Sequence, residues 1–235
     1  MKKLVKKIFA AAGADIRRIH PEDNNYKWLE KYTIKTVIDI GANTGQFAAQ
    51  IHEILPNADI FSFEPLADCF EKLLENMKSA ANFKAFNLAL GDKEDHDEIY
   101  RSEFSPSSSF LRMGDTHKNI YPHTCNSTAE KVTIIKLDTA LHAIELKDNL
   151  LVKIDVQGYE DKVIAGGIDT ISRANVIITE VSFEELYKGQ PLFSTIYDML
   201  VKIGFEYKGN LDPQRKNPVD GRVLQADSIF IKKEI

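Results

Sequence analysis

The chain has 235 residues, of which 43% are hydrophobic, and its formal net charge is -5 at pH 7. This length suits one α/β domain with a sizeable core, so we expect a single domain over residues 1–235. The net negative charge provides no global attraction to nucleic-acid phosphates, and nucleic acid is therefore not an expected partner.

The two cysteines, Cys69 and Cys125, bear on the cellular compartment. They have no metal-ligand spacing and no partner histidines in register. We therefore expect two reduced thiols in a cytoplasmic protein rather than a disulfide.

The N-terminal segment, residues 1–19, is basic and partly apolar. Lys6 and Lys7 interrupt its apolar stretch, which is too short to span a bilayer. Its hydrophobic residues recur at helical spacing with lysines on the opposite face. We expect residues 1–35 to be a helical extension that packs on its own domain or makes peripheral contact with the inner membrane surface.

From residue 36 onward, strand-like and helix-like segments alternate. Such alternation predicts βαβ units and a mostly parallel sheet covered by helices on both faces. The expected strands are residues 37–40, 58–65, 83–90, 150–156 and 175–181, and the expected helices are residues 45–55, 67–80 and 160–171.

The rest of the chain is less regular. Residues 92–130, rich in Ser, His, Asp and Pro, are expected to be an irregular region, in which serines 107–109 either hydrogen-bond a ligand or belong to a flexible lid. Residues 130–144 predict a strand leading into a short helix, and residues 194–210 a helix and a strand. The last strand, residues 227–235, follows a loop too short for a crossover helix, so we expect it to be antiparallel.

A glycine turn follows the first strand, in the stretch TVIDIGANTGQF. Asp39, Gly41 and Gly45 lie where a strand ends and a helix begins, which is the edge at which open α/β sheets bind ligands. Gly41 would let the backbone turn tightly and let a ligand approach closely. The spacing differs from the G-x-G-x-x-G of dinucleotide folds, and a leading acid suits a ligand with a cationic amine or sulfonium. A purely structural turn is the alternative.

An acidic residue, Glu64, ends the second strand about twenty residues beyond the glycines. At that place a carboxylate accepts hydrogen bonds from both ribose hydroxyls of an adenosine cofactor. The residues after the third strand, from Ala89 to Asp92, would form the next lip of the same cleft and could cover an adenine ring. Asp155 and Glu180 close the fourth and fifth strands, so the cleft is expected to be lined with acids.

Six stretches in chain order, VIDIGANTGQF, FSFEP, NLALGD, KLDTAL, VKIDVQGYEDKVIAGG and IITEV, followed by DSIFIKK, resemble the FkbM family of S-adenosylmethionine-dependent methyltransferases. The resemblance covers roughly residues 36–233. It implies a Rossmann-like class I methyltransferase fold, with a mostly parallel seven-stranded sheet and an antiparallel last strand, and methylation of a hydroxyl on a sugar, glycan or natural-product molecule. The family commonly has Glu where this chain has Gln157.

The expected cofactor is S-adenosyl-L-methionine, and its expected contacts are Asp39, Gly41, Asn43, Gly45, Glu64, Pro65, Ala89, Leu90 and Asp155. The reaction needs a hydroxyl held in line with the methyl group and a base that removes its proton. Asp155 and Glu180 are the catalytic candidates, and a helix cap or a contact to the cofactor amine is the alternative role for Asp155. Glu160, His117 and His123 are further candidates, with a place in the first helical turn favoured for Glu160.

No third ligand is marked by spacing beside Asp155 and Glu180, so no metal is expected. A nicotinamide-dependent dehydrogenase has the same architecture and is the rival enzyme. This sequence lacks two features expected of it: the glycine spacing of dinucleotide folds, and the tyrosine followed four residues later by lysine that short-chain dehydrogenases would use. The alternative that is not an enzyme is a scaffold protein that binds S-adenosylmethionine without catalysis. The presence of Gln157 in place of the family's common Glu leaves this alternative possible. The acceptor is expected to be a small molecule or a glycan.

Overall fold

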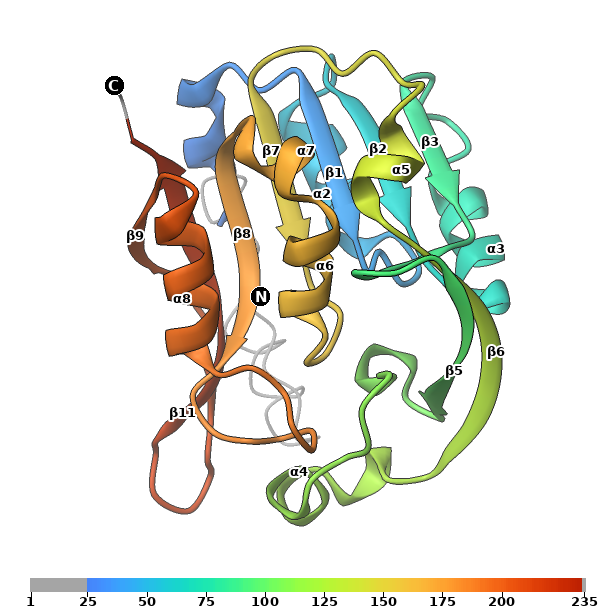
Figure 1. Cartoon of the computed structure of the whole chain (residues 1–235), viewed down its shortest axis with the longest axis vertical. Helices are drawn as coiled ribbons and strands as arrows, with labels where there is room; N and C mark the ends of the chain where they lie inside the picture. Colours follow the sequence, from blue (N-terminus) through green and yellow to red (C-terminus); the bar gives the residue numbers. More distant parts are fainter. Residues whose placement is uncertain (1–24, 234–235) are drawn as a thin grey trace, which may run out of the picture.

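A mostly parallel β-sheet forms the centre of the structure, a computed structural model that describes residues 25–233 (Figure 1). Most of the expected N-terminal helical extension therefore lies outside the described residues. In the described part the sheet has eight strands in the order β10-β11-β8-β7-β1-β2-β3, and β9 pairs with β11. The strands are β1 (Thr36–Ile40), β2 (Asp59–Phe63), β3 (Phe83–Phe86), β7 (Leu150–Ile154), β8 (Ala174–Ser182), β9 (Phe205–Asn210), β10 (Arg215–Lys216) and β11 (Val223–Lys232).

The strand directions confirm the expected fold class. Neighbouring strands from β3 to β8 are parallel, and β11 is antiparallel to β8, β9 and β10. The expected seven strands become eight among the described residues because the two-residue strand β10 also pairs with β11. The carboxyl ends of the parallel strands meet at one edge, where ligands bind in such sheets.

Helices cover both faces of the sheet. On one face lie the 3-10 helix η2 (Lys27–Tyr32), α2 (Gln46–Ile54) and α3 (Ala67–Asn76), and on the other lie α5 (Leu137–Leu141), α6 (Glu160–Gly166), α7 (Ile168–Ser172) and α8 (Phe193–Lys202). In residues 25–233, none of the helices has the length and apolar character needed to cross a membrane.

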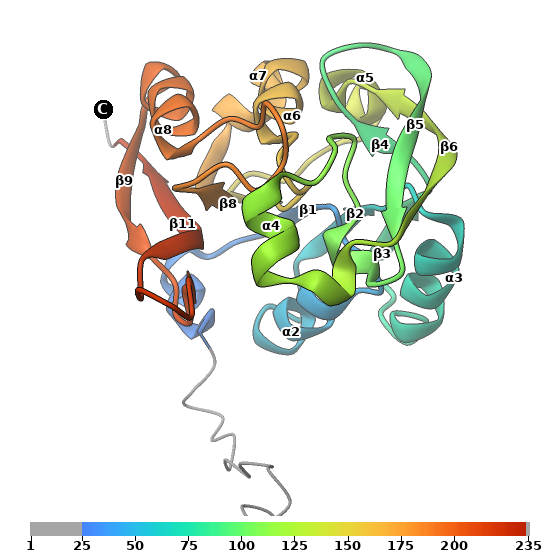
Figure 2. The same ribbon diagram turned by 90° about the horizontal axis from the view of Figure 1, so that it is seen from below.

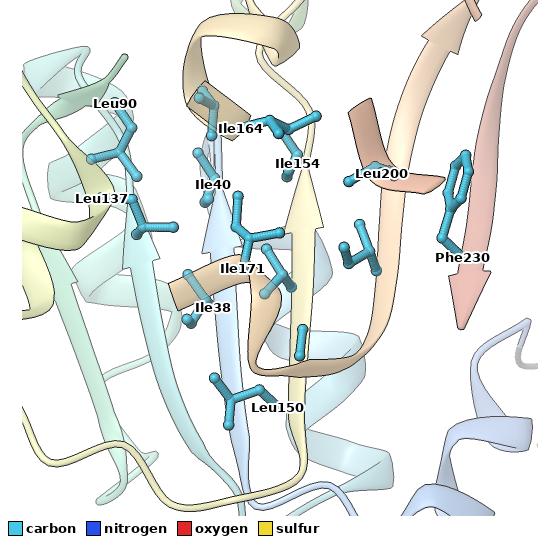
Figure 3. Packing of buried hydrophobic residues seen from close by; sticks show 14 of the residues in the cluster. Ile38, Ile40, Leu90, Leu137, Leu150, Ile154, Ile164, Ile171, Leu200 and Phe230 are labelled. Carbon is cyan, nitrogen blue, oxygen red and sulfur yellow. The ribbon is translucent and has the colours of Figure 1, made fainter. Parts of the chain in front are cut away.

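Alternation along the strands divides the core between these two faces. Val37 packs with the α2 and α3 side, whereas Ile38 and Ile40 pack with the other side. Figure 3 shows Ile38 and Ile40 beside Ile164 of α6 and Ile171 of α7. Because the central strands are buried on both faces, most of their residues are apolar and polar residues do not alternate regularly with them.

The helix expected over residues 160–171 is in fact two helices. It is divided at Gly166 and Gly167, where α6 ends and α7 begins. A Cβ on Gly166 would lie 1.8 Å from the carbonyl oxygen of Gly91, and one on Gly167 would lie 2.7 Å from Leu137. The glycine pair therefore allows the chain to pack closely against its neighbours where the helix is interrupted.

The prediction that residues 92–130 are irregular is wrong over much of that range, because the range contains most of a second sheet. This sheet, in the order β4-β6-β5, consists of β4 (Ala89–Leu90), β5 (Asp95–Ser102) and β6 (Ser127–Ile135). The strand expected over residues 83–90 is likewise divided, since β3 belongs to the main sheet and β4 to the second. The first four residues of β5 are exposed, so that strand lacks the apolar alternation that predicts strands.

The segment between β5 and β6 lies on the side of the carboxyl ends of the parallel strands. It contains η3 (Ser105–Ser107), α4 (Asp115–Ile120) and η4 (Pro122–Thr124). Figure 2 looks at this side and shows α4 in front of the sheet edge. The second sheet and this segment thus build the outer wall of the region where a ligand is expected.

Candidate functional site

A cavity of about 300 Å³ lies at the carboxyl ends of β1, β2 and β7. We call it the sheet-edge cavity. Of the expected cofactor contacts it brings together Asp39, Gly41, Asn43, Glu64, Pro65, Ala89, Leu90 and Asp155. Two expected site residues, Gly45 and Glu180, are not among the residues that line it.

The two glycines of the turn are explained by packing within the protein. Gly41 has φ +81°, and a Cβ there would lie 1.9 Å from the carbonyl oxygen of Asp155, so this position accepts no side chain. Gly45 has φ +90°, and a Cβ there would lie 2.8 Å from Leu73 of α3. Gly41 therefore joins β1 closely to the end of β7, whereas Gly45 faces α3 and not the cavity.

Glu64 connects the glycine turn to the end of β2. One carboxylate oxygen accepts a hydrogen bond from the backbone N–H of Asn43 at 2.8 Å, and the other accepts one from Leu66 at 2.9 Å. The Asn43 side chain in turn donates to the hydroxyl of Ser105 at 3.1 Å. Burial raises the pKa of Glu64 to about 7, against the effect of the two backbone N–H groups. A carboxylate is thus held in the cavity by the turn beside it.

Asp39 is fully buried in the floor of the same cavity. Its carboxylate accepts a hydrogen bond from the Ser62 hydroxyl at 3.1 Å. Burial raises the pKa of Asp39 to about 7, although the Lys153 ammonium acts in the opposite direction. The folded protein therefore holds a proton on Asp39 at a pH where an ordinary aspartate has lost it.

Replacement of Asp39 by asparagine is expected to stabilise the protein increasingly as the pH rises from about 4 to about 7. A raised carboxyl pKa favours folding least at high pH, because ionisation then favours the unfolded chain by about 1.4 kcal/mol per pH unit. Asparagine cannot ionise and can still accept from Ser62. Urea unfolding at pH 5 and pH 8 measures the difference, with exposed Asp148→Asn as the control. An equal effect of Asp39→Asn at both pH values would contradict this interpretation.

A buried lysine, Lys153, lies beside Asp39 and between two carboxylates. Its ammonium is 3.3 Å from Asp155 Oδ2 and 3.1 Å from Asp227 Oδ1. Burial alone would lower the pKa of Lys153, but the two aspartates raise it, so the lysine carries its charge. Lys153 lines the sheet-edge cavity and holds Asp155 in place there.

Gln157 bridges Asp155 and Glu180, and we call these residues, with Tyr187, the Gln157 network. The Gln157 amide donates to Asp155 Oδ1 at 2.8 Å and to Glu180 Oε2 at 2.7 Å. Its Oε1 accepts from the Tyr187 hydroxyl at 3.0 Å. A glutamine supplies both the donors and the acceptor that this arrangement needs, and a carboxylate in its place would face two others.

The two acids of the network differ in their charge. Burial alone would raise the pKa of Asp155, but the Lys153 ammonium, with Arg215 and Gln157, brings it below its ordinary value. Burial and the neighbouring Asp155 raise the pKa of Glu180, although Arg215 lies 2.9 Å from its Oε1. Asp155 is thus an ionised carboxylate facing the cavity, and Glu180 supports it from behind through Gln157.

Replacement of Gln157 by glutamate is expected to lower the free energy of unfolding by about 2–4 kcal/mol at pH 8, because a carboxylate would lose the donated hydrogen bonds and meet Asp155 and Glu180 as like charges. The new carboxyl would have a raised pKa, so part of the loss should return as the pH falls towards 5. Urea unfolding at both pH values tests this, with Gln50→Glu on the exposed face of α2 as the control. Equal stability of Gln157→Glu and the parent at pH 8 would contradict it.

The three weaker candidates lie away from the cavity. Glu160 is buried and accepts backbone N–H bonds from Val156 and Gly158 at 3.1 Å, so it fixes the chain before α6. His117 is buried, and its Nε2 is 2.9 Å from the Thr124 hydroxyl. His123 is exposed. The structure gives none of the three a place on the cavity wall.

Serines 107–109 are part of a wall with fixed contacts. The Ser109 hydroxyl donates to the carbonyl of Gln157 at 2.6 Å, and the Tyr187 hydroxyl lies 3.1 Å from the Ser107 carbonyl. Ser108 lines the sheet-edge cavity. Movement of this segment as a lid would have to break these hydrogen bonds, so a stationary wall agrees better with the contacts.

Sequence reasoning gave no role to Lys153, Arg215 or Ser105. For Lys153 a signal was present, since a lysine inside the apolar strand LLVKI is rarely buried without a partner. Arg215 comes from β10, far along the chain, and no local pattern relates it to Glu180. Within residues 25–233 no group of three or more His, Cys, Asp or Glu residues is arranged to hold a metal ion; the expectation of no metal stays a prediction.

Comparison with known proteins agrees with this geometry. The methyltransferase FkbM domain matches residues 39–207. The 2-O-methyltransferase NoeI of Sinorhizobium fredii is 31% identical over 175 residues, which cover 70% of each chain. The hexuronic acid methyltransferase AglP of Haloferax volcanii is 30% identical over 145 residues, covering 61% of this chain and 54% of AglP.

Among solved structures, the methyltransferase FkbM of Methylobacillus flagellatus superposes with a TM-score of 0.52 at 13% identity. The match covers 85% of this chain and 44% of that one, so it supports the fold and not a shared substrate. The domain match extends from the acid of the glycine turn into β9 and includes the whole sheet-edge cavity region between them. The chain is therefore an enzyme of the FkbM methyltransferase family.

Proposed function

We propose that this methyltransferase transfers the methyl group of S-adenosylmethionine to a hydroxyl of a sugar or glycan. The observation that carries the proposal is the sheet-edge cavity, whose lining includes both Glu64, directly after β2, and the ionised Asp155, directly after β7. The relative named as a 2-O-methyltransferase supports methyl transfer to an oxygen, and the relative named as a hexuronic acid methyltransferase supports a sugar as the acceptor.

The cavity residues suit S-adenosylmethionine. A volume of about 300 Å³ is at the lower end of ligand cavities. Its apolar wall includes Leu90, Ile99 and Phe110, which fit an adenine ring, and Glu64 presents a carboxylate that fits ribose hydroxyls. The ionised Asp155 fits a ligand with cationic groups. When bound, S-adenosylmethionine supplies an electrophilic methyl group.

In this proposal Asp155 orients the acceptor hydroxyl and accepts its proton. Its low pKa makes it a weak base but keeps it ionised across neutral pH, so it can accept a hydrogen bond at all times. Lys153 and Gln157 fix the carboxylate through its two oxygens. Placement of the hydroxyl then contributes more to the rate than the strength of the base.

Calorimetry with S-adenosylmethionine tests the cofactor, with NAD as the parallel control because the nicotinamide alternative shares the architecture. Binding of S-adenosylmethionine alone is the expected result, followed by S-adenosylhomocysteine formation with a panel of sugars. Binding of NAD, or of neither compound by a folded sample, would contradict the proposal. A scaffold protein would bind S-adenosylmethionine and form no S-adenosylhomocysteine with any acceptor.

The remaining expectations accompany this proposal. A small-molecule or glycan acceptor and the absence of nucleic acid as a partner follow from the proposed reaction and from the net charge of -5. The peripheral membrane contact proposed for the basic N-terminus involves residues 1–19, which lie outside the described part of the chain. A cytoplasmic location fits a reaction that uses an intracellular methyl donor.

A further inference from the structure

A second cavity, of about 340 Å³, lies on the other side of the wall formed by the segment after β5. We call it the basic cavity. Ser107 and Leu111 line it, whereas Ser105, Ser108 and Phe110 of the same segment line the sheet-edge cavity. Neighbouring residues of this one short segment thus line different cavities. The remaining residues of the basic cavity are Tyr100, Arg112, Met113, Lys118, Cys125, Ser127 and Lys188.

Three cations and no carboxylate are found among these lining residues. In residues 25–233, Arg112, Lys118 and Lys188 have no ion-pair partner. The Arg112 guanidinium lies 4.7 Å from the centre of the Tyr100 ring, and the backbone N–H of Lys188 donates to the Arg112 carbonyl at 2.8 Å. In a chain with a net charge of -5, three uncompensated cations around one hollow are a local exception.

This charge and shape fit a phosphate or diphosphate group. Guanidinium and ammonium groups donate charge-assisted hydrogen bonds to phosphate oxygens, and Arg can do so with two parallel bonds. The hydroxyls of Ser107, Ser127 and Tyr100 add donors without charge. All three cations are exposed, and a bound anion gains charge-assisted hydrogen bonds from them that a neutral ligand does not.

The basic cavity is also joined to the Gln157 network. Tyr187, whose hydroxyl reaches Gln157 and the Ser107 carbonyl, directly precedes Lys188. Two residues of the basic cavity, Ser107 and Lys188, therefore adjoin Tyr187, which in turn contacts Gln157. An acceptor long enough to pass around this wall would place its anion in the basic cavity and its hydroxyl in the sheet-edge cavity.

We propose that the basic cavity binds the phosphate or diphosphate group of the methyl acceptor, so that the substrate is a phosphorylated sugar rather than a free sugar. This inference rests on the proposed function, since it names the substrate class of the same enzyme. A glycosyl phosphate, a nucleoside diphosphate sugar and a lipid-linked glycan diphosphate share this chemistry.

Titration with inorganic pyrophosphate at constant ionic strength tests the anion site directly. We expect saturable binding to the parent protein and binding at least about tenfold weaker in the double variant R112A/K188A, because two charge-assisted contacts are lost. The variant K84A/K202A removes two exposed lysines elsewhere and should bind as the parent does. Absence of saturable binding to the parent, or equal binding by R112A/K188A, would overturn the proposal.

Cys125 provides a reporter within the cavity that needs no mutation. It lines the basic cavity and is partly accessible, whereas Cys69 is buried and serves as the internal reference. Pyrophosphate should slow maleimide labelling of Cys125, followed by mass spectrometry, and S-adenosylhomocysteine should not. Equal labelling with and without pyrophosphate would contradict occupancy of this cavity.

Methyl transfer identifies the source of the anion. Phosphorylated sugars are expected to have KM values at least about tenfold lower than the matching free sugars, and R112A/K188A should remove that difference without weakening S-adenosylmethionine binding. A glycosyl phosphate, a nucleoside diphosphate sugar and a short-chain lipid diphosphate sugar are the three test acceptors. Equal KM values for free and phosphorylated sugars would overturn the inference of a phosphorylated acceptor and would not affect the proposed methyl transfer. Failure to bind S-adenosylmethionine would instead count against the proposed function alone.

Discussion

Replacement of Glu64 by alanine is expected to weaken S-adenosylmethionine binding about 30- to 150-fold. The physical reason is the loss of charge-assisted hydrogen bonds from the ribose hydroxyls, worth on the order of 2–3 kcal/mol. Glu64 also accepts from the backbone N–H groups of Asn43 and Leu66, so the alanine variant would in addition loosen the glycine turn. Calorimetric titration of the purified variant measures the change in affinity.

Two further variants separate the ligand contact from the turn. Glu64→Gln keeps one acceptor for the backbone and loses the charge, so we expect an intermediate affinity. Glu75→Ala removes an exposed carboxylate of α3 that pairs with Lys78, and it should bind as the parent does. Parent-like affinity in folded Glu64→Ala would show that this carboxylate serves the turn and not the cofactor.

The sheet was predictable because its strands obey a simple physical rule. Most of residues 37–40 and 150–156 are apolar because both faces of the central strands are covered by helices, and Gly41 and Gly158 mark the breaks after them. The last antiparallel strand followed from loop length alone. In contrast, β5 packs one part of its length and exposes the rest, so residues 95–102 carry no alternating pattern. The second sheet was missed for that reason.

The ends of the strands were also predictable, but the directions of the side chains there were not. Asp39, Glu64 and Asp155 follow from strand position, and all three line the sheet-edge cavity. Glu180 occupies the equivalent place on β8, yet it turns to Gln157, Gln225 and Arg215. Those partners come from distant segments, so only the folded chain reveals that Glu180 supports the site from behind.

Gln157 illustrates how a departure from a family pattern can have a local cause. Its amide is a donor to two carboxylates at once, and its carbonyl accepts from Tyr187. A glutamate at this place would have to hold a proton or lie against an added cation to avoid repulsion. The presence of glutamine therefore keeps Asp155 and Glu180 compatible without either, and it gives no reason to regard the enzyme as inactive.

Replacement of Asp155 by asparagine is expected to lower the methyl-transfer rate at least about a hundredfold, since a positioned base contributes about that much or more. Asparagine is nearly isosteric and its one acceptor oxygen can still accept from Lys153, although the bond that Gln157 donates to the other oxygen is lost. The rate of S-adenosylhomocysteine formation and the affinity for S-adenosylmethionine are measured on the same sample.

The control is Asp227→Asn, which takes from Lys153 its other carboxylate but does not line the cavity. A defect shared by both variants would follow from the loss of charge balance around the buried lysine. If only Asp155→Asn is defective, the two measurements distinguish its role. A lower methyl-transfer rate with unchanged affinity for S-adenosylmethionine assigns the carboxylate to the acceptor hydroxyl. A lower affinity for S-adenosylmethionine assigns it to the cofactor amine. A parent-like rate in Asp155→Asn would contradict its role as the base, because no other ionised carboxylate of the Gln157 network faces the cavity among the described residues.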